Sequence, residues 1–118
     1  MHKPVALLVH VPDVSQGFKW YQKAFPFASS RYLPEFDFTV LDIEGFSLEL
    51  VQADDKVPSG KSGIVLYWSV ENLRESMDFL HSIGATLYRG PMEIKGGISI
   101  CQMEDPFGNL IGLRGFNV

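Results

Sequence analysis

Residues 9–21 read VHVPDVSQGFKWY, and residues 68–80 read WSVENLRESMDFL. The two stretches align at a constant offset of 59 residues, so that Val11 corresponds to Val70, Asp13 to Asn72 and Phe18 to Met77. The ends of the two halves also correspond, because DIEGFSLEL at 42–50 matches DPFGNLIGL at 105–113 at an offset of 63. A repeat of this length indicates two copies of one supersecondary unit.

The first copy has the pattern of a strand, a helix and three more strands. An apolar run at residues 5–11 predicts a buried strand, and Asp13 or Ser15 is placed to cap a helix that ends before Pro26. The helix carries an apolar stripe of Val14, Phe18, Tyr21 and Phe25. Strands are then expected at residues 28–33, 35–43 and 46–52.

The second copy repeats this order. A strand is expected at residues 64–70, followed by a helix that starts at Glu71–Asn72 and ends at Gly84. Its apolar stripe consists of Leu73, Met77, Leu80 and Ile83. The last strands are expected at residues 86–94, 98–104 and 110–114. The sequence therefore predicts an α+β fold of two tandem β-α-β-β-β modules that form a cupped mixed sheet with a helix on the outer face of each half.

Length and composition narrow the classes of function. A chain of 118 residues fits one domain, with module 1 at about 4–53, a polar linker at 54–63 and module 2 at about 64–116. The net charge of −4 and the lack of a basic cluster argue against nucleic acid or a membrane surface as the partner. No apolar run is long enough for a membrane span. Cys101 is the only cysteine, so no internal disulfide is possible, and we expect a cytoplasmic protein.

The V-P-D segment, the closing DPFGNLIGL stretch and the paired modules together resemble the vicinal oxygen chelate superfamily, over essentially the whole chain. This superfamily includes glyoxalase I, extradiol dioxygenases and the fosfomycin- and bleomycin-resistance proteins. The resemblance implies that the two modules curl into a cup that holds the active site or ligand.

The same resemblance assigns four positions to the family's metal ligands. Two lie on the first strands, seven residues before Asp13 and Asn72, and here they are Ala6 and Val65. Two lie on the last strands, and here they are Glu49 and Gly112. Three of the four residues have no side-chain atom that could bind a metal, and one carboxylate cannot hold a divalent ion alone. We therefore expect no metal site and no cofactor.

Strand alternation predicts which side chains face the cup. The expected ligand-binding residues are Phe36, Phe38, Glu49, Tyr67, Ser69, Met103 and Arg114, with His10 beside them. Each of these residues also has a structural interpretation: Glu49 could pair with Arg114 or His10, and Arg114 could be a solvated charge at the rim. Cys101 is expected to be a small buried hydrophobic residue.

Three functions are consistent with these residues and this fold. The favoured one, similar to the bleomycin-resistance branch, is metal-independent sequestration of a small aromatic or amphipathic compound by a homodimer, as in antibiotic resistance. The acidity of the chain would favour a cationic ligand. The second is an isomerase or lyase that uses Glu49 as general base on a carbon acid, helped by His10. The third is a structural or regulatory dimer whose groove is filled by its own side chains.

Overall fold

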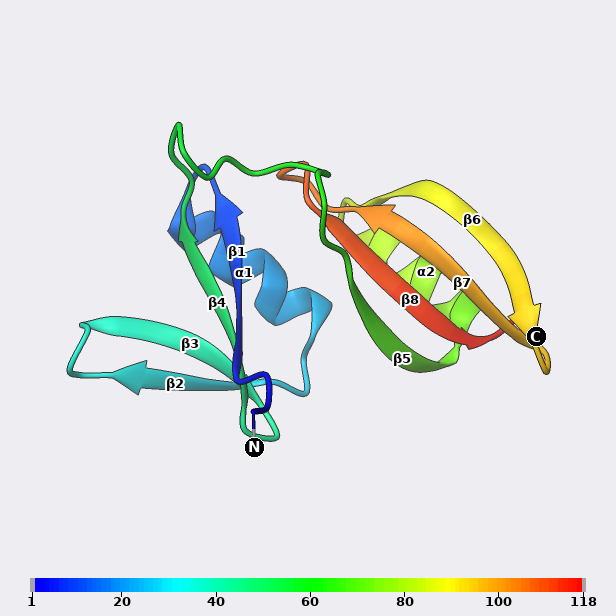
Figure 1. The fold of residues 1–118 in the computed structure, drawn as a ribbon, viewed down its shortest axis with the longest axis horizontal. Helices are drawn as coiled ribbons and strands as arrows, with labels where there is room; N and C mark the ends of the chain where they lie inside the picture. The colour runs from blue at the N-terminus through cyan, green and yellow to red at the C-terminus, as the bar shows by residue number, and fades with distance from the viewer. Residues whose placement is uncertain (1, 118) are drawn as a thin grey trace. The chain divides into compact units, whose positions relative to one another are not determined.

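The computed structural model describes residues 2–117, and the chain divides into two compact units between Ser59 and Gly60. This division lies inside the predicted linker. Each unit is a β-α-β-β-β module with its own four-stranded sheet (Figure 1). The predicted α+β class and the two repeated modules are thus confirmed.

In the first unit, one helix packs on a mixed sheet. The elements are β1 (Ala6–Val11), α1 (Val14–Ala24), β2 (Ser29–Leu33), β3 (Phe38–Ile43) and β4 (Phe46–Gln52). The strand order is β1-β4-β3-β2, in which β1 is parallel to β4 and the other neighbours are antiparallel.

The second unit has the same topology. Its elements are β5 (Leu66–Asn72), α2 (Leu73–Ser82), β6 (Thr86–Lys95), β7 (Ile98–Glu104) and β8 (Leu110–Phe116). The strand order is β5-β8-β7-β6, again with the first strand parallel to the last. Helix α2 lies across one face of this sheet (Figure 1).

Both helices begin at the two residues that the repeat aligns. Asp13 is the N-cap of α1 and accepts a hydrogen bond from the Gln16 N–H at 3.0 Å. Asn72 is the N-cap of α2 and accepts one from the Glu75 N–H, also at 3.0 Å. Such caps satisfy backbone donors that the first helical turn leaves unpaired. No helix in the described part of the chain is long and apolar enough to cross a membrane.

The core of each unit lies between the helix and the sheet. In the first unit Val11, Leu48 and Leu50 are essentially inaccessible, and a Cβ atom at Gly17 would come within 2.8 Å of Val11 Cγ2, so the helix lies very close to β1. In the second unit three members of the predicted helix stripe are buried against apolar side chains of β7 and β8, whereas the fourth, Ile83, is the C-cap residue and is only half-buried. The buried residues are Leu73, Met77, Leu80, Cys101, Met103, Ile111 and Leu113.

The structure corrects two predictions in the first unit. The strand expected at 35–43 begins only at Phe38, because residues 34–37 form a turn in which the Phe36 N–H donates to the Leu33 carbonyl. Phe36 is therefore 73% exposed in a turn rather than placed on a strand. The buried face of α1 is centred on Gly17, Trp20, Tyr21 and Ala24, and the expected stripe members Val14 and Phe18 are only half-buried.

The DPFGN stretch folds into a turn that is hydrogen-bonded around one carboxylate. Asp105 is 3% exposed, and its Oδ1 accepts from the Phe107 N–H at 2.8 Å and from the Asn109 N–H at 2.9 Å. Gly108 has a φ of +91°, which a residue without a Cβ adopts readily. The side chain of Asn109 accepts a hydrogen bond from the Gly60 N–H at 2.8 Å, so the turn also fixes the start of this unit.

Replacing Asp105 with alanine should lower the free energy of unfolding by about 1–3 kcal/mol, because two part-buried N–H groups lose their acceptor. Asp105→Asn keeps an acceptor oxygen in the same place and should cost less than half as much. Urea unfolding followed by circular dichroism measures both changes. Equal losses for the two variants would show that the hydrogen bonds to Oδ1 are not the cause.

Cys101 gives the stability a dependence on pH. The thiol is 2% exposed, and burial raises its pKa from 9.0 to about 11. The unfolded chain therefore loses this proton at a lower pH than the folded chain does. Stability linked to Cys101 should be fully present below pH 9 and should decrease as the pH rises towards 11, by on the order of 2 kcal/mol.

The measurement is the difference in unfolding free energy between wild type and Cys101→Ala from pH 8 to pH 11. This difference removes the contribution of tyrosines and lysines that titrate in the same range. A difference that stays constant with pH would contradict the assignment.

Candidate functional site

Each sheet has one face that its helix leaves uncovered, and we call it the open face. Residues that are partners across neighbouring strands point to the same side, so the registers identify both faces. The open face of the first sheet carries Ala6, Leu8, His10, Ser47, Glu49 and Val51. The open face of the second carries Tyr67, Ser69, Ile100, Gln102, Gly112 and Arg114.

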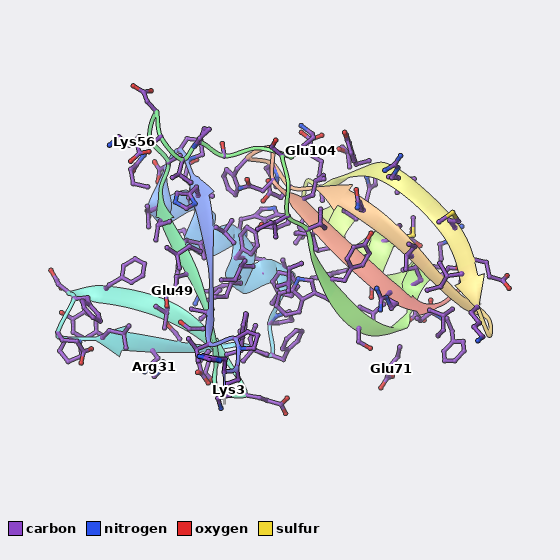
Figure 2. The ribbon with its side chains drawn as sticks, viewed as in Figure 1. Lys3, Arg31, Glu49, Lys56, Glu71 and Glu104 are labelled. Atoms are coloured by element: carbon purple, nitrogen blue, oxygen red, sulfur yellow. The ribbon has the colours of Figure 1, made fainter. Side chains whose placement is uncertain are left out.

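Glu49 shares the open face of the first sheet with a second carboxylate, Asp42 of β3, which is the partner of Ser47. Glu49 is half-buried on β4, on the side of the sheet away from α1 (Figure 2). Its Oε2 accepts a hydrogen bond from the Ser47 hydroxyl at 2.8 Å, and Ser47 is itself only 7% exposed. Leu8 is the partner of Glu49 on β1, and His10 lies one step further along, beside Val51. Glu49 is thus held by a neighbour on its own strand and has an apolar side chain next to it.

The open face of the second sheet is built around Tyr67. Its partner across β5 and β8 is Gly112, and a Cβ atom at that position would lie 2.6–2.7 Å from three carbons of the Tyr67 ring. The ring therefore occupies the space that any other side chain at position 112 would fill. Gly112 is what allows an aromatic ring to rest directly on the sheet.

Two polar side chains fix this ring. The Gln102 Nε2 donates to the Tyr67 hydroxyl at 3.0 Å, and the Arg114 guanidinium lies 5.4 Å from the ring centroid, within the range of a cation–π contact. A pocket of about 330 Å³ opens beside the ring. It is lined by Tyr67, Arg89, Gly90, Met92, Ile100, Cys101 and Gln102.

The predicted site residues fall in several places. Tyr67, Ser69 and Arg114 lie together on the second open face, and Glu49 lies on the first. Phe38 is half-buried and lines a separate pocket with Val14 and Phe18 of α1. Glu49 accepts a hydrogen bond from the Ser47 hydroxyl, a partner that the sequence did not predict.

Met103 departs from the expectation that it contacts a ligand. It is 1% exposed and is the partner of Ile111 in the helix-facing row, because the register of β7 turns Gln102 and Ile100 to the open face instead. Gln102, Ile100, Met92 and Arg89 are pocket residues that the sequence pattern did not reveal. Alternation along residues 98–104 would have grouped Ile100 with Gln102, but it could not say which set faced outward.

The four positions at which the family places metal ligands can be checked for side-chain atoms that could bind a metal. Ala6 and Gly112 lie on the open faces and offer no donor atom, and the remaining first-strand position is Val65. Across residues 2–117, no group of three or more His, Cys, Asp or Glu side chains is placed to hold a metal ion. The residues of this chain thus do not fit the metal centre that the fold implies.

Known proteins of the same fold cover nearly the whole chain. An integron cassette protein from the mobile metagenome of V. cholerae is 19% identical, with a TM-score of 0.72 over 98% of this chain and 96% of that one. TnmS3, an antibiotic binding protein from Streptomyces sp. CB03234, is 21% identical, with a TM-score of 0.73 over 98% and 96%.

A glyoxalase/bleomycin resistance protein/dioxygenase family enzyme from Burkholderia phytofirmans PsJN is 17% identical, with a TM-score of 0.70 over 93% of this chain and 95% of that one. A search of curated proteins found no match. The sequence model of one superfamily matches residues 3–113. The chain therefore belongs to the Glyoxalase/Bleomycin resistance protein/Dioxygenase superfamily.

Proposed function

We propose that this protein binds a small aromatic or amphipathic molecule without the help of a metal, and that it sequesters the molecule rather than converts it. The observation that carries the proposal is the Tyr67 ring, which rests on Gly112 and is held by Gln102. A related structure of the same fold is named as an antibiotic binding protein, which supports a binding role.

The pocket beside Tyr67 has the character of a small-molecule site. Its volume of about 330 Å³ lies within the range of ligand clefts. Met92 and Ile100 supply apolar surface, and Gln102 and Arg89 supply a few polar groups that could orient a ligand. A flat ring could stack on Tyr67, a contact worth about 0.5–1.5 kcal/mol beyond the burial of its area.

We further propose that the protein acts as a homodimer. The outer strands of each sheet, β1 and β2 in one and β5 and β6 in the other, each have only one neighbouring strand within their own sheet. Such edges leave backbone hydrogen-bonding groups available for a second chain.

The binding proposal predicts that aromatic compounds raise the melting temperature and that Tyr67→Ala weakens their binding. Loss of the stacking surface should raise the dissociation constant roughly two- to tenfold. Gly112→Ala should have a similar effect, because its Cβ displaces the ring. A thermal-shift screen of aromatic antibiotics and naphthalene derivatives, followed by calorimetry of the hits, provides the measurement.

Tyr32→Ala is the matched control, since Tyr32 is an exposed tyrosine of the other unit. Binding that is equally weakened in all three variants would place the ligand elsewhere. If no compound of the screen binds, the sequestration proposal is wrong, and the structural or regulatory alternative is favoured instead.

Glu49 supports a second candidate function, that of a carbon-acid isomerase or lyase. A half-buried carboxylate with a fixed orientation on an open sheet face could remove a proton from a carbon next to a carbonyl group and return it. The Ser47 hydroxyl would hold the carboxylate in position.

For this enzyme, Glu49→Gln should reduce turnover at least a hundredfold and leave substrate binding within about twofold, because the amide keeps the shape but cannot take a proton. Ser47→Ala should have a smaller effect on turnover. Assays on enolisable carbonyl compounds, with and without a chelator, measure these rates. Turnover that survives in Glu49→Gln would exclude this carboxylate as the base.

A further inference from the structure

We propose that the molecule bound beside Tyr67 is an anion, specifically an aromatic carboxylate whose negative group is held by Arg114 and Arg89. This inference rests on the proposed binding function and adds the charge of the ligand to it. It also differs from the cationic ligand that the net charge of the chain suggests.

The two arginines lie on either side of the apolar floor of the pocket. Arg114 on β8 is the partner of Ile100 on β7, and Arg89 on β6 is the partner of Gln102 on β7. The strands β8, β7 and β6 are neighbours in that order, so the two guanidinium-bearing strands flank the one that supplies Ile100. An aromatic body on this floor would have a cation within reach at both sides.

Neither arginine is neutralised by a carboxylate of the described chain. Among residues 2–117 no Asp or Glu lies within ion-pair distance of Arg89 or Arg114. Glu104 is in the same row of β7 as Gln102, but its carboxylate lies 3.1 Å from Lys61 Nζ. Asp105 is buried in the turn, where it accepts backbone hydrogen bonds.

The hydroxyl group of Tyr67 is a further hydrogen-bond donor on this face. Gln102 donates its amide N–H to the Tyr67 oxygen, so the phenol's own hydrogen is directed elsewhere. Guanidinium groups carry donors only. Apart from the carbonyl oxygen of Gln102, these polar side chains around the ring offer N–H and O–H hydrogens, and a carboxylate is the complementary partner for them.

The acidity of the chain does not oppose this charge preference. Residues 1–59 contain five Lys or Arg and eight Asp or Glu residues, whereas residues 60–118 contain five and six. Charges further away than about 8 Å are largely screened at physiological ionic strength. The two guanidinium groups at the pocket therefore outweigh the net charge of the molecule.

The test uses three probes with one flat apolar body and different charges: 2-naphthoate, 2-naphthamide and 2-naphthylmethylammonium. Dissociation constants come from NMR titrations of the full-length chain. We expect 2-naphthoate to bind at least fivefold more tightly than 2-naphthamide. Arg114→Gln should weaken 2-naphthoate about tenfold and change 2-naphthamide by less than twofold, since it removes a charge-assisted contact.

Arg89→Gln should act in the same direction, and it provides the test by itself if Arg114→Gln fails to fold. Arg74→Gln is the control, because Arg74 is an exposed arginine on α2 and should leave all three constants unchanged. If the amide or the ammonium probe binds as tightly as 2-naphthoate, the anionic preference is wrong and the proposed binding function stands. If no probe perturbs the resonances of the open face, both proposals fail.

Discussion

The parallel pairing of the first strand with the last is the constraint on which each module depends. The last three strands are joined by direct connections between antiparallel neighbours, whereas the parallel pairs β1–β4 and β5–β8 need a crossover connection, which includes the helix. This pairing places Leu8 beside Glu49 and Tyr67 beside Gly112. Because the helix must cover one face, the other face remains available for side chains that the core does not need.

Most of the fold could be predicted because its signals are local and occur twice. The N-caps Asp13 and Asn72, the apolar stripe of α2 and the turn at 105–109 each follow from a few neighbouring residues. The apolar run at residues 5–11 likewise indicated a strand, which the structure has at Ala6–Val11 with Val11 fully buried.

The parts that could not be predicted have physical reasons. In β7 each alternating set mixes apolar and polar residues, so the pattern alone left the direction of the strand open. One set is Ile98, Ile100, Gln102 and Glu104, and the other is Ser99, Cys101 and Met103. Phe36 favours a strand by its own propensity, but Pro34 two residues before it and the positive φ of Asp37 after it define a turn. The pocket residues of β6 depend on register shifts, which alternation does not predict.

The two modules have become different at the position where the family places a metal ligand. In the first module this position keeps a carboxylate, Glu49, which is bonded to Ser47. In the second it is Gly112, and the missing side chain has two consequences. It removes a donor atom, and it makes room for the Tyr67 ring, since even one methyl group would overlap the ring. The same glycine therefore lacks a metal-binding atom and makes room for the aromatic ring.

The contacts of Tyr67 also explain how such a surface can be ready before a ligand arrives. Its hydroxyl is held by Gln102 and its ring face is covered on one side by Gly112, so the side chain has little freedom left to lose. Arg114 contributes to this order through a cation–π contact, which does not use up its N–H donors. A residue that stabilises the ring in the free protein thus keeps its hydrogen-bonding capacity for the bound state.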